Sequence, residues 1–337
     1  MNDVLSDVLR AIRLTGAVFF SIDGTAPWGV QGFSATAVGP LIRPGVDHII
    51  QFHAVATGSC WIGLLDEPPV ELHTGDILVL PHSDRHRLSS APGVRAEPVS
   101  IRLDPDQPCP VPVPVRLGSG DGASCRLICG FLGCEARPFN PLLAAIPQPM
   151  VVVRGAGRDA ALARLIELAL AESSARSAGR EIVLARLAEL MFVEAVRLHI
   201  AAAPEKVGWL GGVSDEVVGR ALALLHARPR QAWTLEDLAR GVGASRSVLA
   251  ERFASLVGTP PMQYLAQWRM QLASELLSET RGSLAEIADR VGYGSEAALS
   301  RAFKRVVGAS PAQWRAGKSR AERRPRRGAM VRLARSR

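Results

Sequence analysis

An internal repeat constrains this chain more than any other feature of its sequence. Residues 235–265 match residues 284–315 at an offset of 49, which becomes 50 after a turn that is one residue longer in the second copy. Each copy begins with Thr or Ser and has Asp or Glu three residues later, the capping pattern that starts a helix. Gly243 and Gly292 then stand where a helix can end in a left-handed residue. The repeat predicts two helix-turn-helix units in tandem.

The second helix of each unit has an inward and an outward face. In the second copy, Leu299 and Phe303 point inward. The outward face carries short side chains and basic side chains, as a helix in the major groove requires. Between the copies, residues 262–277 lack proline and glycine and predict one helix of about 24 Å. Such a helix can hold two recognition helices near 34 Å apart, about one duplex turn. An ordinary helical hairpin explains one copy equally well, but the repeat favours DNA binding.

Fixed positions in the second copy follow a known signature: Arg269-Met270, Ile287-Ala288, Val291-Gly292-Tyr293, Phe303-Lys304, Gly308 and Ser310-Pro311. On these residues, the region from about 214 to 315 resembles the DNA-binding domain of the AraC/XylS family of bacterial transcription regulators. The resemblance implies promoter DNA and RNA polymerase as partners.

The same resemblance implies base-reading positions at Ser247, Ala250 and Glu251 in the first recognition helix, and at Ala297, Ser300 and Arg301 in the second. Two of them depart from a typical reader of bases. Ala250 has no hydrogen-bonding side chain, and Glu251 is repelled by phosphate unless it accepts a hydrogen bond from a cytosine amine. The DNA-binding candidates are Arg246, Ser247, Ala250, Glu251, Ser295, Glu296, Ala297, Ser300, Arg301 and Lys304.

Size and composition limit the class of protein. A chain of 337 residues, 47% of them hydrophobic, should form about two domains. No apolar run approaches the roughly 18 residues of a membrane helix. Asp3 and Asp7 lie where a signal peptide carries positive charge. We therefore expect a cytoplasmic protein with no membrane partner, whose five cysteines are thiols.

Charge is divided unevenly along the chain. Residues 1–212 hold 18 Lys and Arg against 21 Asp and Glu, a net −3, whereas residues 213–337 hold 22 against 11, a net +11. Nine of these basic residues lie in 317–337, opposed only by Glu322. We expect this tail to be disordered and to attract phosphate independently of sequence, although a solvated run of charge is the alternative.

The N-terminal part has a different pattern. Residues 1–15 suit a short amphipathic helix, and from there to about residue 137 short β-rich pieces alternate with Gly, Pro, Asp and Ser, which indicates an antiparallel barrel or sandwich. The run 75–86 resembles the second motif of the cupin superfamily, and the first motif is partly present at Gly45 and His53. The expected fold is α+β and multidomain: an N-terminal antiparallel β-barrel of cupin type, then an all-α tandem helix-turn-helix domain.

The barrel interior is the expected sensor. The resemblance to cupins implies a possible divalent transition metal at His53 and His86, which Cys60 or His82 could complete, because thiolate and imidazole together suit such ions. No cofactor is certain, and a structural polar pair inside the barrel is the alternative. A small-molecule effector would be bound near Gln51, His53, Cys60, Trp61 and His86.

Cys125, Cys129 and Cys134 form a second group of candidates. Residues 125 and 129 share a face if they lie on one strand. Neither spacing is that of a Cys-x-x-Cys site, and buried single cysteines behave as small hydrophobes. Redox sensing by a low-pKa thiol and metal capture are the two regulatory hypotheses.

The remaining segments connect the domains. Residues 158–170 and 181–200 predict two amphipathic helices, either a hairpin on the barrel or the interface of a homodimer. We expect a sensor domain at 1–145, a connecting and dimerisation segment at 146–212, a DNA-binding domain at 213–316 and the tail at 317–337. The leading hypothesis is a transcription regulator, an activator or a repressor, with an unknown effector. A cupin-type metalloenzyme fused to a DNA-binding module is the alternative.

Overall fold

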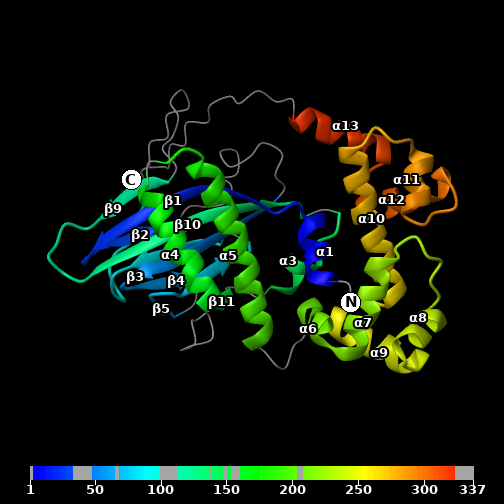
Figure 1. Cartoon of the computed structure of the whole chain (residues 1–337), viewed down its shortest axis with the longest axis horizontal. Coiled ribbons are helices and arrows are strands. Elements are labelled where there is room, and N and C mark those ends of the chain that lie inside the picture. Colours follow the sequence, from blue (N-terminus) through cyan, green and yellow to red (C-terminus); the bar gives the residue numbers. More distant parts are fainter. Residues whose placement is uncertain are drawn as a thin grey trace. The chain divides into compact units, whose positions relative to one another are not determined.

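The computed structural model describes residues 3–32, 48–64, 68–82, 84–98, 112–136, 138–146, 150–152, 160–175, 177–202 and 208–322 (Figure 1). These residues form two compact units. The β unit contains residues 14–134 and 147–201, and the helical unit contains residues 1–13, 135–146 and 202–324.

The β unit is built from two sheets. The six-stranded sheet has the order β11-β6-β3-β10-β1-β9, and the five-stranded sheet has the order β5-β4-β7-β2-β8. Most neighbours are antiparallel, but β1 with β9 and β2 with β8 are parallel pairs. The expected N-terminal antiparallel β domain is confirmed, and its strands form a sandwich-like pair of sheets, one of the two forms that the sequence pattern indicates, instead of a closed barrel. The strands are β1 (Thr15–Thr25), β2 (Gly29–Gln31), β3 (His48–Thr57), β4 (Ser59–Leu64), β5 (Val70–His73), β6 (Ile77–Leu80), β7 (His86–Ser89), β8 (Glu97–Pro98), β9 (Val113–Leu117), β10 (Ser124–Cys134) and β11 (Met150–Val152).

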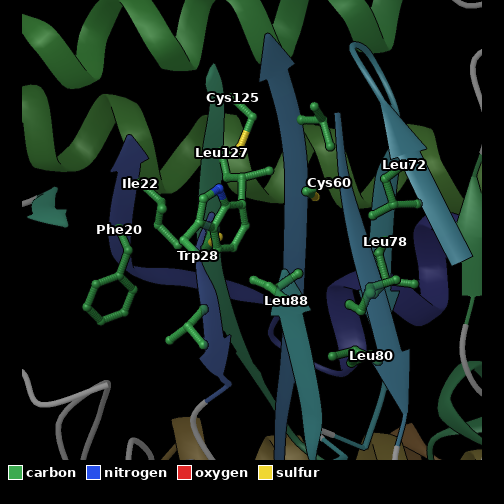
Figure 2. Close-up of a cluster of buried hydrophobic side chains, with 14 of the residues drawn as sticks. Phe20, Ile22, Trp28, Cys60, Leu72, Leu78, Leu80, Leu88, Cys125 and Leu127 are labelled. Atoms are coloured by element: carbon green, nitrogen blue, oxygen red, sulfur yellow. The ribbon is translucent and has the colours of Figure 1, made fainter. Parts of the chain in front are cut away.

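The core of the β unit lies between the sheets, where inward side chains of both form one apolar cluster (Figure 2). Leu78 on β6 and Leu127 on β10 are fully buried there. Two helices follow in the chain, α4 (Ala160–Ser174) and α5 (Arg180–Ala202), as the periodicity predicts. A Cβ at Gly16 would lie 2.2 Å from the Ala185 carbonyl oxygen, so only glycine lets β1 approach α5 this closely.

The helical unit confirms the tandem helix-turn-helix. The Ser283–Glu286 capping box is present, Thr234 caps the matching helix, and Gly243 and Gly308 are left-handed C-caps. Residues 209–212, at the end of the segment expected to connect the domains, are helical, and so is the start of the expected disordered tail, up to Glu322. Residues 203–207 and 323–337 lie outside the described residues. The helices are α6 (Trp209–Ser214), α7 (Glu216–Ala227), α8 (Leu235–Val242), α9 (Arg246–Val257), α10 (Pro261–Glu279), α11 (Leu284–Arg290), α12 (Glu296–Val307) and α13 (Pro311–Glu322).

Two short N-terminal segments complete the helical unit: α1 (Val4–Ala11) and the stretch around α3 (Pro141–Ala145). The fully buried Gln271 of α10 connects them, because its amide donates to the Ala11 carbonyl at 2.9 Å and accepts from the Phe139 N–H at 3.2 Å. The sequence-based division assigns both segments to the sensor. The structure instead places α1 in the helical unit, because a short amphipathic helix needs an apolar surface to pack on, and α7 and α10 provide one.

Candidate nucleic-acid interface and interior pocket

The recognition helices α9 and α12 are fixed by equivalent contacts. Leu249 and Phe253 anchor α9, Leu299 and Phe303 anchor α12, and all four side chains are fully buried. The hydroxyls of Ser245 and Ser295 accept from the N–H groups of Val248 and Ala298, at 3.3 and 3.2 Å. Each helix therefore has a defined rotation about its axis, which decides which side chains face outward.

The predicted DNA-contacting residues lie on that outward face. Ala250 and Ser300 are half-buried, and the others are exposed. Among the described residues, no carboxylate forms an ion pair with Arg246, Arg301 or Lys304. Arg252, by contrast, is held by Asp215 through bonds of 2.6 and 2.9 Å. Among the predicted contacts, the basic side chains without a carboxylate partner in the described residues are therefore Arg246 on α9, and Arg301 and Lys304 on α12.

One exposed residue of α9 was missed by the sequence reasoning. Val248 is 48% exposed on the first turn, next to Ser247. An apolar side chain in the major groove can contact a thymine methyl group. The sequence signal was an apolar residue outside the buried stripe of Leu249 and Phe253.

The β unit contains a mostly apolar pocket. Its free volume is about 20 Å³, room for about one water molecule. Of the predicted effector residues, Gln51 and His53 line it, and His86 contacts His53. Cys60 instead lies in the core cluster, and Trp61 is half-buried elsewhere on β4. The lining residues are Phe20, Ile22, Val30, Gln31, Gly32, Gln51, His53, Leu88, Val115, Leu117 and Cys129.

Two polar features mark this pocket. The first is Gln51, which is 1% exposed and whose side-chain oxygen has no hydrogen-bond partner among the described residues. A buried polar atom without a partner is costly, so a ligand or water that donates to it would be stabilised.

The second feature is a chain of hydrogen bonds. His86 Nδ1 lies 2.8 Å from the Asp84 carbonyl oxygen, His53 Nε2 lies 2.8 Å from His86 Nε2, and Cys129 Sγ lies 2.9 Å from His53 Nδ1. A carbonyl can only accept, so His86 Nδ1 carries a proton. It follows that His53 donates from Nε2 and that the Cys129 thiol donates to His53 Nδ1. Burial lowers the pKa of His53 and His86 and raises the pKa of Cys129, so the chain is neutral.

A resident metal does not fit these residues. A metal ligand must offer a lone pair to the ion, but the His86 Nε2 lone pair accepts from His53 and the His53 Nδ1 lone pair accepts from Cys129. In the described part of the chain, no three His, Cys, Asp or Glu side chains are grouped to hold an ion. The pair is better explained as a hydrogen-bonded structural element.

The cysteines also differ from what redox sensing requires. A sensing thiol needs a low pKa and access to solvent. Burial raises the pKa of Cys125 to about 11 and that of Cys129 well above its ordinary value. Cys134 is 2% exposed. These environments favour inert thiols at all three positions.

Comparisons with known proteins match the N-terminal and the C-terminal parts of the chain to different domain families. A cupin family model matches residues 3–201, and a helix-turn-helix domain model matches residues 238–317. Within the described residues, no helix is long and apolar enough to cross a membrane.

Three relatives match nearly the whole chain. A putative AraC-like transcription regulator of Streptomyces lividans is 35% identical over 93% of this chain and 98% of its own. A protein with the same description from Streptomyces antibioticus is 32% identical over 93% and 98%. The HTH-type transcriptional regulator AlkR of Acinetobacter baylyi is 29% identical over 93% and 99%. The chain therefore belongs to the AraC-like transcription regulators, with a cupin domain before its helix-turn-helix domain, and is a regulator rather than an enzyme.

Proposed function

We propose that this regulator binds promoter DNA through both recognition helices and that a small molecule in the β-unit pocket controls that binding. The observation that supports DNA contact is the outward face of α12, where Arg301 and Lys304 are exposed without a carboxylate partner among the described residues. Contact with RNA polymerase, implied by the family, is part of the same proposal.

Binding of the purified chain to DNA from its own upstream region tests this function. Competition by unrelated DNA should be weak if the complex is specific. Removing residues 317–337 should weaken binding to all DNA alike and flatten its salt dependence, because the nine basic residues of this segment attract phosphate independently of base sequence. A deletion that altered binding to one promoter alone would make the tail a specificity element.

The proposal that the pocket binds an effector rests on Gln51. Its unpartnered oxygen in an apolar pocket suits a small neutral molecule that carries one hydrogen-bond donor. The pocket is small, so a larger effector requires the partly buried Val115 and Leu117 to move. Thermal unfolding in the presence of small alcohols and phenols should show a ligand-dependent rise in Tm, which Gln51→Leu should abolish. A rise that persists in Gln51→Leu would place the ligand elsewhere.

A homodimer is the proposed assembly. Leu168 on α4, with Ile182, Val183 and Leu190 on α5, are large apolar side chains that are 39–58% exposed. Exposed apolar side chains on neighbouring helices indicate an interface, and a dimer would place two DNA-binding units on adjacent sites. Light scattering should give twice the monomer mass for the wild type and a lower mass for Leu190→Glu.

A further inference from the structure

The two helix-turn-helix units are connected by more than the long helix α10. We propose that a contact centred on Arg269 locks the two recognition helices at one spacing, so that the protein accepts only one separation between its two DNA contact segments. This inference rests on the proposed function, because it concerns how both units reach the same DNA.

Arg269 lies on α10 and binds the first unit. Its Nε–H donates to the Pro229 carbonyl at 2.8 Å, and its Nη2 donates to the Gln231 carbonyl at 2.8 Å. Both carbonyls belong to the segment between α7 and α8. The planar guanidinium therefore fixes the start of the first helix-turn-helix to α10 through two bonds of defined direction.

The same side chain binds the second unit. The Arg269 guanidinium carbon lies 5.7 Å from the centroid of the Tyr293 ring, a cation–π distance. Tyr293 lies in the turn between α11 and α12 and packs on the apolar core of the second unit. One arginine thus joins the segment before α8 to the turn before α12.

The backbones of these two segments also approach each other closely. Gly292 has a φ of 81°, and a Cβ there would lie 2.7 Å from the Arg230 carbonyl oxygen and 2.9 Å from Arg269 Nη2. Only glycine fits this position. Beside it, Arg230 Nη2 bonds to Asp289 Oδ1 at 2.6 Å. We call these residues, with Arg269 and Tyr293, the junction.

The junction removes a freedom that α10 alone would leave. A helix of 19 residues spans about 28 Å. The second unit packs on Met270, Ala273 and Leu277 of this helix, and a bend in the helix would still let the two units tilt relative to each other. The junction ties the units together beside the helix, so their relative rotation is set. Adding one base pair between the DNA segments turns one segment by about 34° and moves it by about 3.4 Å. A locked pair cannot follow that change.

The test compares three DNA sites for the purified full chain: the footprinted site, and the same site with one base pair added or removed between the two protected segments. The wild type should bind the altered sites roughly tenfold more weakly or worse, the size of one lost base contact. Arg269→Ala should bind the original site within a few-fold of the wild type, and its preference for the original spacing should fall.

Three further variants keep the test decisive. Arg240→Ala is the matched control, because Arg240 is exposed and its ion pairs with described residues, Glu236 and Asp237, all lie within α8. Arg269→Lys keeps the charge but cannot reach both carbonyls, and it replaces Arg269→Ala if that variant does not fold. Arg230→Ala, 67% exposed, should fold and show a smaller loss of preference.

An unchanged spacing preference in the folded Arg269 variants would overturn the lock. Failure of the wild type to bind any of the three sites would instead overturn the proposed function. The two failures are therefore distinguishable.

Discussion

The two helix-turn-helix units share a fold but carry opposite charges at matching positions. At the offset of 50, Arg246 of α9 corresponds to Glu296 of α12, and Glu251 corresponds to Arg301. The residues that the units share are caps, glycines and buried side chains, which make the fold. The residues that differ face outward. We infer that the two units read unlike base sequences, so the binding site is not a direct repeat.

The units also differ in their support. The first is backed by α1, α6 and α7, where the buried His226 stacks on Trp268 at 4.1 Å and bonds to the Tyr264 hydroxyl at 2.9 Å. That hydroxyl also accepts from Trp209. The second unit packs on α10 and α13, with Phe303 edge-on to Trp314. Substitutions at matched core positions of the two units should therefore increase local unfolding in different parts of the molecule.

The largest expected effects come from the matched core residues Phe253 and Phe303. Both are fully buried, so replacing either with Ala should lower the free energy of unfolding by about 3–5 kcal/mol. Hydrogen exchange should then rise in α1, α7 and α8 for Phe253→Ala, but in α11 and α12 for Phe303→Ala. Identical exchange patterns for the two variants would show that both units are stabilised by the same helices.

Arg301→Ala should have the next largest effect, a loss of DNA-binding free energy. Arg301 is exposed on α12, and loss of a guanine contact should cost about 1–3 kcal/mol of DNA-binding free energy. A binding titration on the upstream DNA measures this cost. Arg240→Ala, which removes the same charge at an exposed position on α8 that pairs with Glu236 and Asp237, serves as the control. Equal promoter affinity for Arg301→Ala and the wild type would remove Arg301 from the interface.

The support of the first unit should depend on pH through His226. Burial is the main cause that lowers its pKa, and the nearby Asp7 only partly opposes this. The unfolded chain therefore binds more protons below about pH 6.5, and this contribution to stability is lost as pH falls through that range. Because a single proton is bound, the free energy of unfolding can change by at most about 1.4 kcal/mol per pH unit.

Denaturant unfolding of the wild type and His226→Gln between pH 7.5 and 5 checks this dependence. The variant should lose less stability on acidification. Glu275, whose pKa is raised to about 7 mainly by burial, acts with the opposite sign, since its contribution falls as pH rises through 7. Glu275→Gln should therefore steepen the loss of stability on acidification, and a shallower loss would contradict this assignment.

Glu251→Ala should have the smallest effect. An exposed carboxylate near phosphate opposes binding weakly, so its removal should strengthen DNA affinity by about 1 kcal/mol or less. A loss of affinity confined to sites with one particular base pair would instead show that Glu251 reads a cytosine amine.

The sequence predicted best what is local and periodic. The caps at Ser283 and Ser295, the turn glycines and the buried stripes of α9 and α12 all depend on residues a few positions apart. The repeat then supplied the tandem arrangement. The outward faces followed from the helical period alone.

What the sequence could not supply depends on distant pairing. Nothing near Phe20 or Cys129 indicates that β1 and β10 are neighbours, so their place in the pocket was missed. Cys60 and Trp61, which were predicted to lie near an effector, do not line this pocket. The parallel edge pairs and the packing of α1 on α10 are likewise tertiary facts. His53 and His86 were found together because motif resemblance carries information on tertiary position.

A hydroxyl-radical footprint of the purified chain on its upstream DNA tests the central claim most directly. Two rigidly joined recognition helices that read unlike sequences should protect two segments of different sequence on one face of the duplex, about one helical turn apart. Arg301→Ala should weaken protection at only one of them. A single protected segment, or two identical segments weakened equally by Arg301→Ala, would contradict the account.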